Sequence, residues 1–160
     1  MAIPLRELYV EAKSVAVVEV VEGRTVSAKG KPCGARYKGR VVHSVKNAAP
    51  RAVIEFGYVP SLKIGTPYLL LLGDYIDVPL EAAPEFHARC KSVLPSTAVI
   101  AHWRGAMEIV GDTGEPGKRE TWTVRPPTHV VFPLGARTTA VHGEKQFWFN
   151  DLVKRMAEEP

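Results

Sequence analysis

A short apolar run between two turn signals constrains the fold of this chain more than any other feature. Residues Tyr68–Leu72 read Tyr-Leu-Leu-Leu-Leu, with Gly65 and Pro67 before the run and Gly73 and Asp74 after it. An apolar run this short, bounded by turn residues, predicts a strand that is buried on both faces rather than a helix. Such a strand needs a neighbour on each side, so we expect it to lie at the centre of a sheet.

The residues before this run predict its neighbours. Residues 4–13 place apolar side chains at helical spacing after a proline, which predicts a short amphipathic helix. Ser14–Glu22 is rich in β-branched residues and predicts a mostly buried strand. Residues 23–34 are polar, with three glycines and a proline, and predict a loop. From Tyr37 to Lys46, apolar and basic residues alternate, which predicts a half-buried strand with a basic outer face; Gly39 within it indicates a bulge or a bend.

The remainder of the chain has a less regular pattern. Residues 52–56 continue the alternation after a turn and predict another strand. Further strands are expected at residues 98–103, 120–124 and 129–132. From Phe149 to Met156, apolar residues recur at helical spacing, with Asn150 available as the helix cap. We therefore expect a single domain over residues 1–160, in which residues 76–146 form an elaborated and less regular part.

Several of these segments also resemble a known family. The motifs that carry the resemblance are the valine-rich stretch Ala12–Val21, then Tyr37-x-x-x-Val41-x-x-x-Val45-Lys46, then Gly65-x-x-Tyr68-Leu69-Leu70-x-Leu72. In this order they resemble the bacterial relatives of the netrin-like, tissue-inhibitor-of-metalloproteinase-like (TIMP-like) domain. The resemblance covers Leu5 to Asp74, and the C-terminal helix is a looser match. It implies a mainly β fold: a five-stranded oligonucleotide/oligosaccharide-binding (OB) barrel with N- and C-terminal helices and extra β-hairpin strands, in an exported protein.

One functional residue of that family has no counterpart in this chain. The animal inhibitors that the chain resembles chelate a protease zinc through an N-terminal cysteine, with its free amine and carbonyl. Here the N-terminal segment contains Ile3 and Pro4, and the first cysteine is Cys33. Inhibition of metalloproteinases by that mechanism is therefore not implied.

A basic stretch supplies the candidate binding residues. Between Gly23 and Ile54 the chain has no Asp or Glu but eight Lys and Arg residues. On the expected strand, Arg36, Lys38 and Arg40 share one face, where they could bind phosphates or anionic sugars. Tyr37 points to the opposite face and cannot stack bases beside them. The net charge of +4 is modest for a nucleic-acid-binding domain, so an ordinary solvated face, whose charge discourages pairing of strand edges, is the favoured interpretation.

The two cysteines bear on the compartment. Cys33 and Cys90 both fall in segments that are expected to be loops, where buried packing is a poor explanation for cysteine. We expect a disulfide between them if the protein is exported, and two separate thiols if it is cytoplasmic. No set of Cys and His residues has the spacing of a zinc site, and no cofactor motif is present, so we expect no metal and no cofactor.

Together these patterns predict a non-enzymatic, exported domain that binds another protein or a component of the cell envelope. One alternative is an OB barrel that binds nucleic acid or another anionic polymer through its basic strand face. A second is a hydrolase that uses Asp74, Asp77 or His102, although Asp74 is also an ordinary turn residue. No apolar run approaches the roughly 18 residues of a membrane helix. No signal peptide is visible before Pro4, so an exported chain would be the mature part. The oligomeric state is left open.

Overall fold

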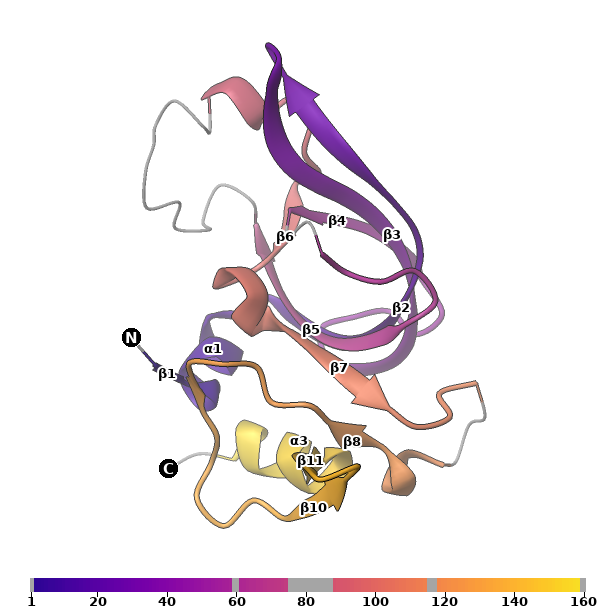
Figure 1. Cartoon of the computed structure of the whole chain (residues 1–160), viewed down its shortest axis with the longest axis vertical. Helices are drawn as coiled ribbons and strands as arrows, with labels where there is room; N and C mark the ends of the chain where they lie inside the picture. Colours follow the sequence, from indigo (N-terminus) through magenta and orange to yellow (C-terminus); the bar gives the residue numbers. More distant parts are fainter. Residues whose placement is uncertain (1, 59–60, 75–87, 115–117, 159–160) are drawn as a thin grey trace.

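The computed structural model describes residues 2–58, 61–74, 88–114 and 118–158, and its fold is mainly β (Figure 1). The strands are β1 (Ile3–Pro4), β2 (Ser14–Ala28), β3 (Lys31–Lys46), β4 (Val53–Tyr58), β5 (Pro67–Asp74), β6 (Thr97–Val99), β7 (Ala106–Val110), β8 (Thr123–Val124), β9 (Val130–Val131), β10 (Thr138–Val141) and β11 (Glu144–Trp148). The helices are α1 (Leu5–Glu11) and α3 (Phe149–Ala157), with the 3-10 turns η2 (His102–Gly105) and η3 (Arg119–Thr121). Within the described ranges, no helix has the length and apolar character needed to cross a membrane.

Strand β5 lies inside the large sheet, as its apolar run predicts. This sheet has nine strands in the order β10-β11-β8-β7-β5-β2-β3-β4-β6, and β1 and β9 form a separate parallel pair. One edge of β5 pairs with β2. The other edge is shared: the part from Tyr68 to Leu70 pairs with β7, and the part from Leu72 to Asp74 pairs with β6. The prediction of a central strand with neighbours on both sides is confirmed.

The first strands of the sheet are paired in a closed circuit. Strand β2 pairs with β3, and β3 with β4, both antiparallel. Strand β4 then pairs with β6 in parallel, at Gly57 and Ala98. Strand β6 pairs antiparallel with β5, which returns to β2. The strands β7, β8, β11 and β10 continue from β5 outside this circuit.

The two faces of β5 belong to two different hydrophobic cores. Leu70 and Leu72 pack in a core with Phe56 of β4, among residues of the closed circuit. Leu69 and Leu71 pack in a second core, which includes apolar residues of α1, β7, β8, β11 and α3. Side chains alternate between the faces of a strand, so an uninterrupted apolar run is what a strand between two cores requires.

Both terminal helices occur where the sequence predicts them, and both cover the second core. The α1 residues Leu5 and Leu8 are buried there, as are Phe149, Leu152 and Met156 of α3. The helices also contact each other.

The expected cap of the C-terminal helix is wrong, because α3 begins at Phe149 and Asn150 already lies inside its first turn. Strand β11 runs directly into the helix. The Trp148 amide donates to the Arg137 carbonyl and the Phe149 amide donates to the Trp122 carbonyl, which keeps the chain extended up to the first helical residue.

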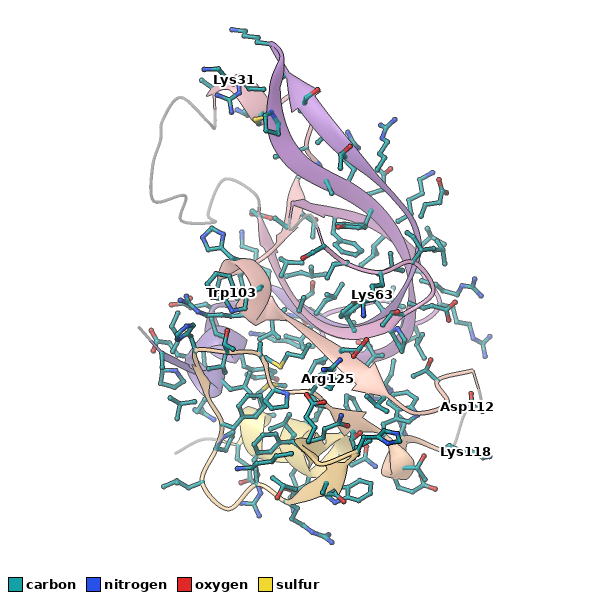
Figure 2. The ribbon with its side chains drawn as sticks, in the orientation of Figure 1. Lys31, Lys63, Trp103, Asp112, Lys118 and Arg125 are labelled. Atoms are coloured by element: carbon teal, nitrogen blue, oxygen red, sulfur yellow. A yellow bond between two sulfur atoms is a disulfide. The ribbon has the colours of Figure 1, made fainter. Side chains whose placement is uncertain are left out.

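The expected loop over residues 23–34 is also wrong. Strands β2 and β3 continue through this segment as a hairpin, paired as far as Ala28 and Lys31. Lys29 and Gly30 form its turn with positive φ angles of 51° and 74°, which are typical of a two-residue hairpin turn. The hairpin extends away from the second core, and Lys31 lies at the far end of the molecule (Figures 1 and 2).

Later in the chain, the sequence patterns are only partly correct. The strand expected at residues 98–103 ends at Val99, where Ala101 and His102 adopt positive φ angles and lead into η2. The strands expected at residues 120–124 and 129–132 are reduced to the two-residue strands β8 and β9. Strands β7, β10 and β11 are not predicted by the patterns; the last two flank a second turn with positive φ angles.

Candidate ligand face on strands β2, β3 and β4

The three basic residues singled out from the sequence lie on the outer face of β3. Arg36, Lys38 and Arg40 alternate along this strand with residues that are buried. One of those buried residues is Tyr37, which belongs to the core of the closed circuit. The inward direction of Tyr37 and the outward direction of its basic neighbours follow the alternation of the strand.

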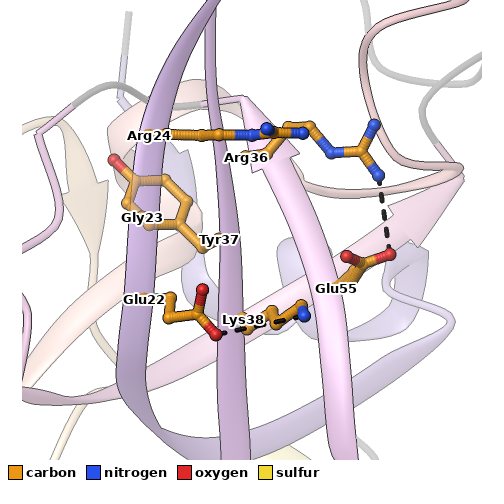
Figure 3. Close-up of a pocket in the computed structure, with 7 residues that line it drawn as sticks. All are labelled: Glu22, Gly23, Arg24, Arg36, Tyr37, Lys38 and Glu55. Atoms are coloured by element: carbon orange, nitrogen blue, oxygen red, sulfur yellow. Dashed lines mark hydrogen bonds and ion pairs between the residues drawn. The ribbon is translucent and has the colours of Figure 1, made fainter.

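A bulge in β2 decides which residues lie opposite them. Val20 pairs with Gly39, but Glu22 pairs with Lys38, so Val21 is an extra residue in β2. The sequence predicts a bulge or bend at Gly39 of β3, but the structure has the bulge in the facing strand β2. Gly39 is required for a different reason: a Cβ atom there would lie 2.3 Å from Cγ1 of Val18. The bulge brings Glu22 to the outer face beside Lys38 (Figure 3).

Carboxylates flank the basic residues on both sides. Lys38 lies between Glu22 of β2 and Glu55 of β4 in the register of the sheet. The Lys38 ammonium is 3.9 Å from the Glu22 carboxylate, and the Arg36 guanidinium is 3.5 Å from that of Glu55 (Figure 3). Both pairs are accessible to solvent, although Arg36 is partly buried, and each contributes roughly 0 to 1 kcal/mol to stability. Although the sequence between residues 23 and 54 has no acid, the folded face is therefore mixed in charge.

Two arginines meet at the end of this face. Arg24 of β2 pairs directly with Arg36 of β3, and the two side chains extend in the same direction in Figure 3. Both residues line two adjoining hollows, of about 240 and 370 Å³. The smaller hollow is lined by Glu22, Gly23, Arg24, Arg36, Tyr37, Lys38 and Glu55. The larger is lined by Arg24, Thr25, Val26, Ser27, Arg36, Ser92 and Val93.

Tyrosines below the face are held by backbone hydrogen bonds. The Leu62 amide donates to the Tyr37 hydroxyl at 3.1 Å, and the Lys63 amide donates to the Tyr68 hydroxyl at 2.9 Å. Burial raises the pKa of both phenols, so they stay neutral. Gly23 leaves room for the Tyr37 ring, because a Cβ atom at this position would lie 2.7 Å from it. Both phenols are therefore held fixed and uncharged in the core of the closed circuit.

A disulfide fixes the far wall of the larger hollow. Cys33 and Cys90 are bonded, with their Cα atoms 5.7 Å apart, and both are buried. The bond connects β3 to the segment that contains Val93, whose carbonyl accepts a hydrogen bond from Nη1 of Arg36 at 3.1 Å. The disulfide expected from the sequence thus ties this face to the chain that precedes β6.

Two of the three residues considered for a hydrolase lie elsewhere in the described structure. The Asp74 carboxylate pairs with Lys13 at the end of β5. The His102 ring stacks on Trp103 of η2, with the ring centroids 6.2 Å apart; Figure 2 labels Trp103. Neither Asp74 nor His102 lines the hollows beside Arg36, and Asp77 lies outside the described residues. In the part of the chain that is described, no group of three or more His, Cys, Asp and Glu side chains could hold a metal ion.

At the other end of β3, a histidine joins the strand to the second core. The Arg119 Nη1 atom lies 2.6 Å from Nδ1 of His43, and the His43 ring meets the edges of Trp122 and Phe149. Partial burial, and then the positive charge of Arg119, lower the pKa of His43. The fold therefore favours the neutral imidazole.

This histidine gives the stability a defined pH dependence. In the unfolded chain a histidine takes up a proton near pH 6.5, whereas in the fold His43 does so only at a lower pH. The free energy of unfolding is therefore expected to be highest above about pH 6.5, to fall as the pH drops through the folded pKa, and to level off below it. Urea unfolding between pH 5 and pH 8 should show this loss in the unaltered chain and a smaller one in His43→Gln. His142→Gln, at an exposed turn, is the control. If the free energy of unfolding of His43→Gln depended on pH as steeply as that of the unaltered chain, the assignment of this pH dependence to His43 would be wrong.

The arginines of the face should differ in their structural roles. Arg36→Gln is expected to lower the free energy of unfolding by about 1 kcal/mol, because it removes the hydrogen bond to Val93. Arg40→Gln, on the exposed part of the same face, should change it by no more than about 0.5 kcal/mol. Denaturant titration of the two variants checks the difference, and equal effects would show that the Val93 contact contributes nothing.

Comparison with known proteins assigns no family. No family model matches the chain, and neither a curated protein nor a solved structure is matched to it. A functional assignment therefore rests on the geometry of the β2–β3–β4 face.

Proposed function

We propose that this chain is an exported, non-enzymatic binding domain with an OB-type barrel, and that it docks another protein on the outer face of β2, β3 and β4. The observation that carries the proposal is the closed circuit β2–β3–β4–β6–β5, in which only β4 and β6 are parallel. OB folds bind ligands on their second and third strands, between the loops that join strands one and two and strands four and five. In this chain the corresponding elements are β3, β4, the β2–β3 hairpin and the segment before β6.

The netrin-like, TIMP-like family is part of the proposal. A helix before the circuit and a helix after it are the arrangement that the resemblance implies, and α1 and α3 have these positions. The departures are an N-terminal segment that lacks the zinc-chelating cysteine and the additional strands β7 to β11. We therefore propose the family's barrel as the scaffold, without its inhibition of metalloproteinases.

The charges of the face favour a protein as the partner. Four basic residues lie on it with three acidic ones, because Glu19 pairs with Arg40 in addition to the contacts of Glu22 and Glu55. A nucleic acid or another polyanion laid along β3 would meet these carboxylates, which disfavours that alternative. A folded protein can present charges of both signs in matching positions.

The disulfide supports export. A buried structural disulfide persists in an oxidising compartment, whereas cytosolic thiols are kept reduced. A partner in the cell envelope or in the extracellular space is consistent with this chemistry.

Photo-crosslinking tests the docking face. Val53 is 65% exposed on β4 beside Arg40, and Val10 is 62% exposed on α1, so the two positions are matched in residue type and exposure. A photoreactive phenylalanine at position 53 of the exported chain, expressed in its own host, should give a discrete protein adduct that position 10 does not. Equal labelling from both positions, or none from position 53, would contradict the proposal.

A nucleic-acid control completes this test. Single-stranded DNA should bind weakly, and replacing Arg36, Lys38 and Arg40 by glutamine should not change that binding. Tight, salt-sensitive binding that disappears in the triple variant would replace protein docking by the polyanion alternative.

A further inference from the structure

One cross-strand pair of the proposed docking face places two positive charges opposite each other. Three register pairs between β2 and β3 have a charge on both residues. Glu19 faces Arg40 and Glu22 faces Lys38, so two of the pairs are of opposite sign; the third is Arg24 facing Arg36. Like charges directly opposite each other destabilise a sheet, so this pair costs folding free energy unless an anion is bound between the two guanidinium groups.

The two guanidinium groups are held differently. The Arg36 side chain is only 26% exposed and donates to both the Val93 carbonyl and the Glu55 carboxylate. The Arg24 side chain forms no hydrogen bond or ion pair with any residue in the described ranges. One arginine is therefore oriented in advance by the fold, and the other has its donors available for a ligand.

The surroundings limit the size and charge of that ligand. The larger hollow beside both arginines has a volume of about 370 Å³ and is also lined by the hydroxyl residues Thr25, Ser27 and Ser92. Glu22 and Glu55 line the smaller hollow on the other side. Their carboxylates would repel a second negative charge placed along the strand, so the site suits one anionic group rather than a chain of them.

We propose that Arg24 and Arg36 together bind one carboxylate, from an Asp or Glu side chain in an exposed segment of the partner protein. The inference rests on the proposed function and names the group that the docking face recognises. A carboxylate is planar and accepts paired hydrogen bonds from a guanidinium, which makes arginine a better partner for it than lysine. A basic residue of the same partner segment would face Glu22 and Glu55.

Arginine side-chain signals of the ¹⁵N-labelled chain provide the test. The probe is acetyl-Gly-Glu-Gly-amide, with acetyl-Gly-Gln-Gly-amide as the neutral match, at constant ionic strength. The Nε–Hε signals of Arg24 and Arg36 should shift saturably with the Glu peptide and remain in place with the Gln peptide. Binding should weaken at least about tenfold in Arg24→Gln, because a charge-assisted pair is lost, and change less than about twofold in Arg137→Gln, at an exposed arginine outside the docking face.

Each contrary result has a defined meaning. Unchanged binding in Arg24→Gln, or an equal shift of the Arg40 signal, would overturn the site. Sodium sulfate binding more tightly than the Glu peptide would overturn the choice of a carboxylate. The Arg24 side chain is exposed and has no hydrogen-bond or ion-pair partner in the described ranges, so this variant remains informative if Arg36→Gln is poorly folded.

The two proposals can fail separately. An adduct at position 53 without binding of the Glu peptide would keep protein docking and overturn the carboxylate site. Binding of the Glu peptide at Arg24 and Arg36, without an adduct at position 53, would support the site and overturn docking on this face.

Discussion

Replacing Cys33 and Cys90 together by alanine is expected to lower the free energy of unfolding by about 4 kcal/mol. The disulfide spans 57 residues, and a crosslink over a loop of that size removes this much chain entropy from the unfolded state. The two sulfur atoms also lie in a small buried cluster with Leu94 and Ala98, which loses contacts in the double variant. Unfolding by guanidinium chloride, with the unaltered chain kept oxidised, measures the difference.

Reduction separates the crosslink from the packing. The unaltered chain treated with a reductant keeps its sulfur atoms but loses the bond, so it should be destabilised by nearly as much as the alanine variant. A loss below about 1 kcal/mol in both would mean that the bond does not restrain the unfolded chain as proposed. The double variant should also bind the Glu peptide less tightly, because the segment that presents the Val93 carbonyl to Arg36 is no longer tied to β3.

Leu152→Ala is expected to destabilise the fold by about 2 to 5 kcal/mol. Leu152 is fully buried in the second core, where it packs in the same cluster as Leu8 and Trp122. Truncating such a side chain removes its transfer free energy and leaves a cavity that the surrounding residues fill only in part. Helix α3 is too short to be stable alone, so its order depends on this burial.

Lys154→Ala on the exposed side of the same helix is the control. It keeps the helix propensity and should change the stability by no more than about 0.5 kcal/mol. Hydrogen exchange should show the amides of α3 protected in the unaltered chain. An unprotected α3, or equal effects of the two substitutions, would mean that the helix is not docked on the core.

The parts of the fold that the sequence predicts are those that face a core. The run Tyr68–Leu72 predicts β5, because a strand between two cores must be apolar on both faces. The terminal helices are predicted for the same reason, since each has one apolar stripe. The hairpin at residues 23–34 is missed because it extends beyond the second core and most of its residues are exposed, so polar residues and glycines give it the composition of a loop. The adjacent Lys29 and Gly30, which form its turn, are the signal that could have indicated it.

The residues of the candidate site are also only partly predictable from the sequence. Alternation along one strand is enough to place Arg36, Lys38 and Arg40 on one face. The opposing residues Arg24 and Glu22 depend on the register between strands and on the extra residue Val21, and neither is visible in the sequence. Glu55 is not predicted as part of the face because it lies just beyond the acid-free stretch in the sequence, and only the pairing of β4 with β3 places it beside Lys38. The mixed charge of the face is therefore a property of pairing rather than of local composition.

The position of strand β5 between two cores also determines how the protein unfolds. Its alternate residues, Leu69 with Leu71 and Leu70 with Leu72, support both cores at once. A fragment that ends before β7 would keep the β2–β6 circuit but expose the leucines that β7, β8 and α3 cover, and such a surface promotes aggregation. Opening either core withdraws support from the other, so we expect thermal unfolding in one transition, with equal calorimetric and van't Hoff enthalpies. The strands of the proposed docking face and the helices that cover the second core then share a single melting temperature.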